Sequence, residues 1–199
     1  MTIFYDFGCP WVYRIGRWLE QVRTDGQYEP KITWRAFPLE QVNAADGPEW
    51  GLWERESRVR SKSRSAFEAA FAAKRQGQDV GSRFQWGLLK AKWENDQDHG
   101  RRSTHLAVAE AVGLDLDQFQ TDLEDPALLS EIGADYAEAR GIHGVFGTPT
   151  VVFPNGGASY LKMTDTFPAD QASAFFGELV ATIRDRPDVL EIKRPTPPN

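Results

Sequence analysis

The sequence predicts an α/β protein with a mixed β-sheet and an all-helical segment inserted into it. A strand, a helix and a second strand follow one another near the N-terminus, and two strands and a final helix come near the C-terminus. From about residue 48 to 140 only helical patterns occur. A strand–helix–strand start favours parallel pairing, whereas a hairpin pairs its strands antiparallel, so the predicted sheet is mixed.

The N-terminal elements follow from short patterns. A β-rich run, Ile3 to Tyr5, comes first, and Lys31 to Leu39 alternates in the manner of a second strand. Between them Pro10 suits the first turn of a helix, where its missing N–H would have had no partner, and Gly26 is placed to end that helix. The apolar face of this helix has three- and four-residue spacing, at Val12, Ile15, Leu19 and Val22.

The middle of the chain predicts several helices. An alanine-rich run at 66–73 and apolar runs at 84–93 and 106–112 carry helical spacing, and Gly113 is a suitable residue to end the last of these. Two more helices are expected further on, the first through Phe119 and Leu123 and the second through Leu128, Ile132 and Tyr136.

Strand character returns at 150–153 and at 158–163. Asn155 and Gly156 between these runs predict a hairpin, because both residues tolerate a positive φ. A final helix is predicted by Phe175, Leu179 and Ile183. This order predicts one domain from residues 1–47 and 141–192, an inserted helical domain at 48–140, and a proline-rich, disordered tail at 193–199.

Composition limits the classes of function. The formal net charge of -6 gives no electrostatic reason to expect nucleic acid as a partner. No stretch approaches the ~20 consecutive apolar residues of a membrane span, so no membrane partner is expected. A single cysteine and three separated histidines predict no metal site, and one cysteine predicts a reducing cytoplasm rather than a disulfide-stapled secreted fold.

Cys9 is the candidate nucleophile. It lies where the first strand gives way to the first helix, and a thiol there faces unpaired N–H groups and the positive end of the helix dipole, which favour thiolate. Val12 stands three residues later, where a dithiol redox enzyme carries its second cysteine. No intrachain disulfide is therefore possible, and a redox cycle needs a thiol from another molecule. The competing interpretation is a small buried apolar residue.

Two motifs resemble a known family. Cys9-Pro10-Trp11 and Gly144-Val145-Phe146-Gly147-Thr148-Pro149-Thr150 resemble the DsbA-like branch of the thioredoxin superfamily. The likeness is to the cytoplasmic group of FrnE-type oxidoreductases, glutathione-using 2-hydroxychromene-2-carboxylate isomerases and kappa-class glutathione transferases. It spans nearly the whole chain and implies a thioredoxin-like fold with an inserted all-helical domain.

The resemblance also implies roles for single residues. Cys9 matches the catalytic cysteine of the redox members, a position that is commonly serine in the isomerases and transferases. Pro149 matches the cis-proline beside the active-site thiol, although a proline also suits the start of a strand. Val12 departs from the pattern, because it replaces the resolving cysteine. The residues expected to contact a substrate or thiol are Pro10, Trp11, Val12, Thr148 and Pro149, with core packing an equal alternative for Trp11.

The implied activity is that of a DsbA-like thiol–disulfide oxidoreductase with one nucleophilic cysteine, resolved by an external low-molecular-weight thiol. Its partner is expected to be a small thiol or mixed disulfide, with glutathione or a related thiol as co-substrate and no covalently bound cofactor. Two alternatives stay open, a glutathione-dependent isomerase or transferase and a catalytically inactive binding module. A homodimer also stays open.

Other charged residues have weaker signals. A basic run is placed either to meet the carboxylates of a small anionic thiol or to form a solvated surface, and it consists of Arg55, Arg58, Arg60, Lys62 and Arg64. His143 lies close in sequence to the proline motif and is expected to be a surface or packing residue.

Overall fold

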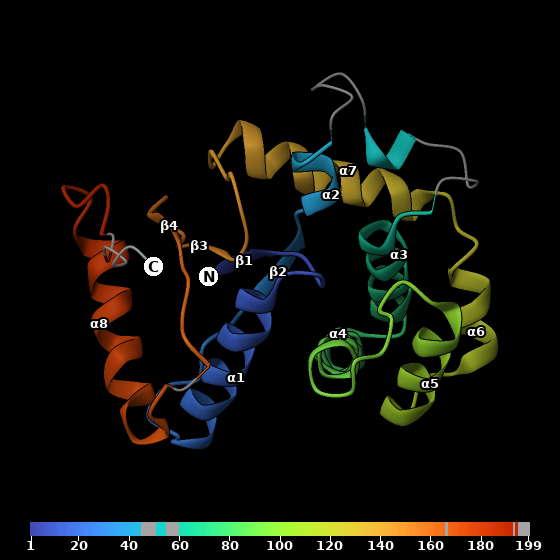
Figure 1. The fold of residues 1–199 in the computed structure, drawn as a ribbon, viewed down its shortest axis with the longest axis horizontal. Helices are drawn as coiled ribbons and strands as arrows, with labels where there is room; N and C mark the ends of the chain where they lie inside the picture. Colours follow the sequence, from blue (N-terminus) through green and yellow to red (C-terminus); the bar gives the residue numbers. More distant parts are fainter. Residues whose placement is uncertain (45–50, 55–59, 166, 193, 195–199) are drawn as a thin grey trace, which may run out of the picture.

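The computed structural model describes residues 1–44, 51–54, 60–165, 167–192 and 194. Its sheet has four strands in the order β2-β1-β3-β4 (Figure 1). Strand β1 pairs parallel to β2 and antiparallel to β3, and β3 pairs antiparallel to β4. The strands are β1 (Thr2–Tyr5), β2 (Thr33–Ala36), β3 (Thr150–Val152) and β4 (Ala158–Tyr160). The predicted mixed sheet is therefore confirmed.

The predicted helices occur in the predicted order and several are longer than their apolar cores, whereas the short α2 was not predicted. They are α1 (Pro10–Thr24), α2 (Leu39–Val42), α3 (Lys62–Arg75), α4 (Gln78–Trp93), α5 (Arg102–Val112), α6 (Leu116–Asp122), α7 (Ala127–Gly141) and α8 (Ala172–Asp185), with short 3-10 turns at Leu52–Glu54 and Ala169–Gln171. Ser61 and Asp115 cap α3 and α6 by accepting a backbone N–H three residues on. Gly113 ends α5 with φ +80°, as expected from its position.

Helices cover both faces of the sheet. Neighbouring residues of a strand point to opposite faces, so Ile3 packs with α1 and α8 whereas Phe4 packs with the end of α7. In Figure 1 the α8 helix stands at one end of the molecule and α3 to α6 form a separate group at the other end, with α1 between them.

The helical segment packs against the first half of α1. One buried cluster joins Phe67 and Phe84 of this segment to Tyr5, Cys9 and Val12. At Gly16 the two parts approach closely, because a Cβ there would lie 2.5 Å from the Trp86 ring of α4. The inserted helices therefore form one wall of the region around Cys9.

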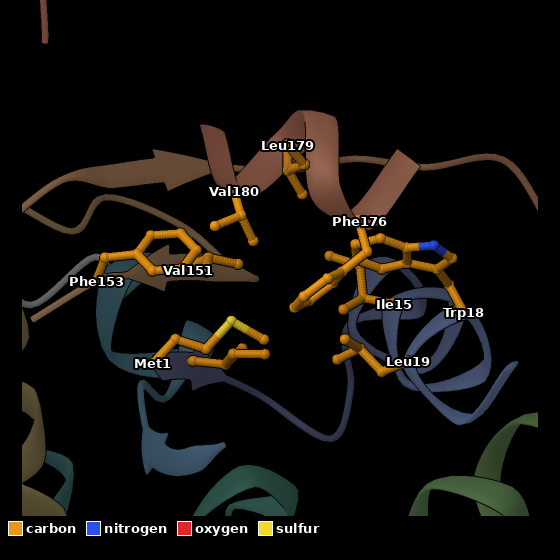
Figure 2. A pocket seen from close by; sticks show the side chains of 10 residues that line it. Met1, Ile15, Trp18, Leu19, Val151, Phe153, Phe176, Leu179 and Val180 are labelled. Atoms are coloured by element: carbon orange, nitrogen blue, oxygen red, sulfur yellow. The ribbon is translucent and has the colours of Figure 1, made fainter. Parts of the chain in front are cut away.

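The other face of α1 encloses a small apolar cavity against α8 and the sheet (Figure 2). Ile15, Trp18, Phe176 and Val151 are among the side chains that line it. Its volume is about 10 Å³, near the lower limit for one water molecule, and its lining is apolar. It is a packing gap of the core and too small for a substrate.

The strands are shorter than predicted. The second strand ends at Ala36 rather than Leu39, because Pro38 has no N–H for the ladder and precedes α2. The last strand ends at Tyr160 rather than Met163. The hairpin is present, but its connection runs from Phe153 to Gly157 with Phe153 N–H donating to the Gly157 carbonyl oxygen, and only Gly156 takes a positive φ there. The predicted boundary at 47/48 and most of the predicted tail, 193 and 195–199, lie outside the described residues.

Candidate active site

Cys9 occupies the turn that joins the end of β1 to α1. It is the N-cap of α1, with φ -92° and ψ 116°, and its side chain makes no capping hydrogen bond. Its N–H donates to the Asp6 carbonyl oxygen at 3.1 Å, which closes the turn before Pro10 begins the helix. The side chain is 3% exposed, whereas the preceding Gly8 is exposed and Pro10 is half-buried. Cys9 is therefore a buried residue in a turn whose two neighbours are more exposed.

The fold brings Cys9 against the proline motif, 139 residues away in sequence. The Cys9 thiol donates to the Thr148 carbonyl oxygen over an Sγ–O distance of 3.2 Å. The Thr148–Pro149 peptide bond is cis, the form that the resemblance implied, and both residues are buried. The Thr148 hydroxyl oxygen is also buried and has no hydrogen-bond partner among the described residues. The two sequence motifs therefore bring together the Cys9 sulfur, the Thr148 carbonyl oxygen and the unpartnered Thr148 hydroxyl.

Val12 lies one helical turn from Cys9 and is fully buried in the same apolar cluster. Its N–H donates to the Cys9 carbonyl oxygen at 3.2 Å, so this amide is already engaged. Among the first amides of α1, Pro10 has none to offer, which leaves the Trp11 amide as the candidate donor toward a thiolate. The position of a second thiol is thus occupied by a core side chain.

An aromatic rim flanks the cysteine turn, and we define it as Trp11, Phe146 and Tyr160. Phe146 is 63% exposed and its ring centroid lies 5.1 Å from that of Tyr160. Trp11 is half-buried, with the Arg14 guanidinium carbon 4.6 Å and the Lys162 amine 5.4 Å from its ring centroid. The rim therefore combines apolar surface with two cations.

Asp6 stabilises the cysteine turn through hydrogen bonds to its carboxylate. Its carboxylate is 1% exposed and accepts the N–H of Gly8 at 2.7 Å, the N–H of Leu39 at 2.7 Å and the hydroxyl of Ser63 at 2.8 Å. Burial raises the pKa of Asp6, against the lowering effect of these three donors. Asp6 thus ties the turn before Cys9 to the starts of α2 and α3.

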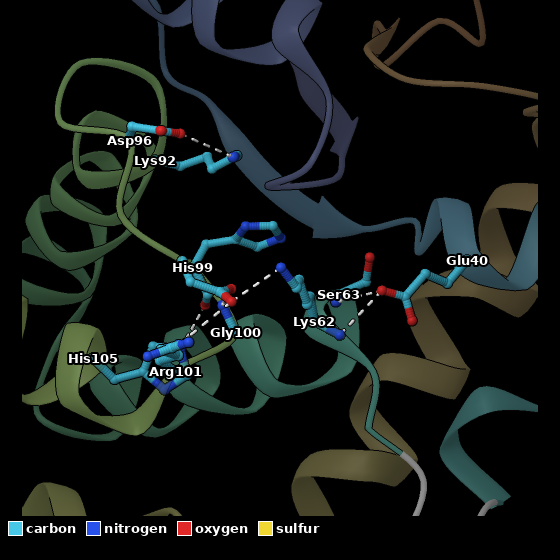
Figure 3. A network of polar contacts seen from close by, with 10 residues as sticks. Glu40, Lys62, Ser63, Lys92, Asp96, His99, Gly100, Arg101 and His105 are labelled. Atoms are coloured by element: carbon cyan, nitrogen blue, oxygen red, sulfur yellow. Dashed lines mark hydrogen bonds and ion pairs between the residues drawn. The ribbon is translucent and has the colours of Figure 1, made fainter.

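His99 packs against the same turn from the loop between α4 and α5. A Cβ placed on Gly8 would lie 3.8 Å from His99 Nε2. The side chain is 6% exposed, and its Nδ1 has no partner among the described residues. Figure 3 shows the surrounding polar network, in which Lys62 pairs with Asp98 at 3.0 Å and Glu40 accepts the N–H of Lys62. Burial, and next the charge of Lys92, lower the pKa of His99 to about 4.

This burial predicts a loss of stability in acid. A histidine whose pKa is about 4 when folded and about 6.5 when unfolded binds its proton preferentially in the unfolded chain. The free energy of unfolding is therefore expected to fall by about 2–3 kcal/mol between pH 7 and pH 4 through His99 alone. Urea titrations of the wild type and of His99→Gln at several pH values measure it. Equal pH dependence of the two proteins would contradict the prediction, whatever their absolute stabilities.

The structure shows no contact of the other charged candidates with Cys9 among the described residues. Lys62 is paired with Asp98 and Arg64 with Glu68, within the helical segment, while Arg55 and Arg58 fall outside the part of the chain that is described. His143 packs against Phe4, with ring centroids 5.7 Å apart, and its Nε2 lies 3.7 Å from Glu138 Oε1.

Three residues near the turn were missed by sequence reasoning, namely Asp6, His99 and Lys162. Asp6 directly follows a strand, which is a common place for functional side chains and was a usable signal. His99 and Lys162 come from distant segments whose local pattern gives no indication of this proximity.

Within the described ranges no three or more histidine, cysteine, aspartate and glutamate side chains are grouped to hold a metal ion. The same ranges contain no helix with the length and apolar character needed to cross a bilayer.

Comparisons with known proteins agree with the fold. A family model described as DSBA-like thioredoxin domain matches residues 1–177, and no curated protein sequence matches. A thioredoxin-like oxidoreductase from Silicibacter pomeroyi DSS-3 is 21% identical, with 89% of this chain and 84% of that chain covered and a TM-score of 0.55. A 2-hydroxychromene-2-carboxylate isomerase is 17% identical, with 96% and 98% covered and a TM-score of 0.65. The cytosolic disulfide reductase DsbM from Pseudomonas aeruginosa, solved with GSH, is 16% identical, with 90% and 98% covered and a TM-score of 0.60.

At these identities the solved structures show the fold, which is thioredoxin-like α/β with an inserted helical region. This confirms the fold class predicted from the sequence.

Proposed function

Because the chain belongs to the DSBA-like thioredoxin family, we propose that it is a thiol–disulfide oxidoreductase that acts through Cys9 alone. The observation that carries the proposal is the contact of Cys9 Sγ with the Thr148 carbonyl oxygen, 3.2 Å apart, at the start of α1. In this proposal the ligand lies along the Thr148–Pro149 backbone, next to the sulfur of the chain's single cysteine. Val12 excludes an internal second thiol, so the resolving thiol is a separate molecule.

The proposed cycle has two exchange steps. The Cys9 thiolate attacks one sulfur of a mixed disulfide between a substrate and a small thiol, so that a Cys9–small-thiol disulfide forms and the substrate leaves as a thiolate that takes up a proton. A second small thiolate then attacks the small-thiol sulfur of this adduct. The two small thiols leave as their disulfide and Cys9 is regenerated. The substrate half of the mixed disulfide is reduced to a thiol, and the one incoming small thiol, glutathione or a related compound, is oxidised.

The surroundings of Cys9 have distinct roles in this cycle. The Cys9 thiol donates a hydrogen bond to the Thr148 carbonyl oxygen, and this oxygen loses its donor when the thiolate forms. The helix dipole and the Trp11 amide then face the thiolate. Pro10 and the aromatic rim line the approach to the sulfur, while Thr148 and Pro149 orient the ligand.

The test is the formation of a single-thiol adduct. Wild-type protein incubated with glutathione disulfide is expected to gain one glutathione on Cys9, faster than a model thiol under the same conditions, because the site orients the disulfide toward the sulfur. Intact-mass spectrometry over time measures the adduct, and added glutathione is expected to remove it.

Two results would favour the alternatives. If no adduct forms but glutathione binds without a covalent bond, the isomerase or transferase function is favoured, in which Cys9 positions or activates a bound thiol. If glutathione does not bind and Cys9 reacts no faster than a model thiol, the binding module is favoured. The 3% exposure of Cys9 is the observation that keeps these alternatives in the test.

A further inference from the structure

We propose that Lys162 is a specificity-determining residue that makes Cys9 prefer disulfides carrying a carboxylate. This inference rests on the proposed exchange chemistry of Cys9 and adds the charge class of its substrate. Lys162 belongs to neither of the sequence motifs, and its position beside them is a property of the fold.

Lys162 is fixed next to the proline motif by the segment that follows β4. The N–H of the preceding Leu161 donates to the Pro149 carbonyl oxygen at 3.0 Å. The Lys162 amine lies 5.4 Å from the ring centroid of Trp11 and 5.4 Å from that of Tyr160. Trp11 is two residues from Cys9, and Tyr160 packs on Gly147 next to Thr148. The ammonium therefore stands over the aromatic rim, between the two motifs that meet at the sulfur.

The Lys162 amine is not neutralised by a neighbouring side chain. No carboxylate lies within 4.0 Å of this amine among the described residues. The side chain is exposed, so an anion from solution is able to reach it. Arg14, the other cation on the Trp11 ring, is differently placed, because it pairs with Asp165 at 3.4 Å and donates to the Met163 carbonyl oxygen. Two aromatic faces hold the Lys162 ammonium by cation–π attraction and leave its N–H donors for an anion. The Lys162 side chain is thus already ordered in the free protein, so it loses little conformational entropy when a ligand binds.

The charge around the sulfur differs from that of the whole chain. A net charge of -6 repels anionic substrates from the molecule in general. The first half of α1, however, carries Arg14 and Arg17 and no acid before Glu20, and the helix dipole adds positive potential at Cys9. Asp165 offsets Arg14, whereas Arg17 and Lys162 have no carboxylate within 4.0 Å among the described residues, and of these two it is Lys162 that lies over the Trp11 ring. Its removal should therefore change the charge preference most.

The experiment compares three small disulfides of similar size and different charge. They are 3,3′-dithiodipropionate, which is anionic, 2-hydroxyethyl disulfide, which is neutral, and cystamine, which is cationic. The rate of Cys9 adduct formation is measured for each by mass spectrometry and divided by the rate of the same disulfide with the neutral model thiol 1-thioglycerol, to correct for intrinsic reactivity. Wild type is expected to prefer the anionic disulfide. Lys162→Gln should slow that reaction by about fivefold to tenfold and leave the neutral one within about twofold.

Lys90→Gln is the matched control. The Lys90 amine also lies over a tryptophan ring, at 5.5 Å from the centroid of Trp86, but on α4. This variant removes the same net charge and should leave the order of the three rates unchanged. High salt should weaken the wild-type preference, because the Lys162 amine is solvent-accessible.

The outcomes separate this inference from the proposed function. If wild-type Cys9 reacts with all three disulfides at equal corrected rates, or if Lys162→Gln slows all three equally, the role of Lys162 is overturned while exchange chemistry stands. An equal effect of Lys90→Gln would overturn it as well, since net charge would then explain the preference. If Cys9 reacts with none of them, the proposed function itself fails.

Discussion

Replacing Cys9 with serine is expected to lower thiol–disulfide exchange by about a thousandfold or more, to the uncatalysed rate. The chain has one sulfur nucleophile, and a hydroxyl forms no disulfide with an incoming thiol. The measurement is turnover of 2-hydroxyethyl disulfide with glutathione, followed through the glutathione disulfide produced. Cys9→Ser should also show no adduct in the intact-mass assay.

The fold of this variant is expected to persist. Serine is slightly smaller than cysteine, and its hydroxyl can donate to the Thr148 carbonyl oxygen as the thiol does. An unchanged thermal unfolding transition, within a few degrees, is the control that separates lost chemistry from lost structure. Full activity in a folded Cys9→Ser protein would contradict sulfur nucleophilicity and favour a transferase in which a bound thiol is the cofactor.

The sequence was sufficient for the order of elements because that order depends on local periodicity. The strand at residues 2–5, the helix after Pro10 and the hairpin at 153–157 all carry their signals within a few residues. Strand ends were less predictable, because Pro38 and the pairing partners of β4 decide where the ladder stops. The loop conformation at Asn155 also departed from the two-residue turn, since Phe153 and Gly157 close a longer connection.

The candidate site was predictable only in the part that lies in the two motifs. Cys9 and Thr148 were identified from their sequence context, and the fold places them in contact. Asp6, His99 and Lys162 reach the same place through tertiary packing: a buried carboxylate binding three segments, a loop histidine against Gly8, and a lysine held by two rings. Contacts of this kind depend on how helices and loops dock, which no single-sequence periodicity encodes. The basic run at 55–64 is the opposite case. Its sequence pattern suggested a role in binding an anionic thiol, but its described cations Lys62 and Arg64 form ion pairs with Asp98 and Glu68.

Restoring a second thiol by Val12→Cys is expected to shorten the lifetime of the Cys9–glutathione adduct by at least about a hundredfold in the absence of added thiol. Residues 9 and 12 share one turn, since the Val12 N–H donates to the Cys9 carbonyl oxygen at 3.2 Å. Cα atoms three residues apart in such a turn lie within about 7 Å, which overlaps the range that disulfides span. The thiol at position 12 would attack Cys9 Sγ within the molecule and release glutathione.

The measurement is an intact-mass time course after excess glutathione disulfide has been removed. Val12→Cys should pass from the adduct to a form lighter than the reduced protein by two hydrogens, which is the intrachain disulfide. Val12→Ala is the matched control: it also removes the valine side chain but adds no sulfur, so its adduct should persist like that of the wild type. A persistent adduct on Val12→Cys would show that the position 12 side chain does not reach the sulfur.

The physical basis of this second prediction is that Val12 alone makes an external thiol obligatory. Val12 is fully buried in the same apolar cluster as Cys9 and lies one turn from it, so a cysteine at position 12 would replace a side chain of similar size. The substitution is small and apolar, and its expected cost to folding is under about 1.5 kcal/mol. If the adduct then collapses to an intrachain disulfide, the Cys9 turn, Thr148 and Pro149 are competent for dithiol chemistry, and the single-thiol cycle of the natural chain follows from one side chain rather than from a loss of the redox site.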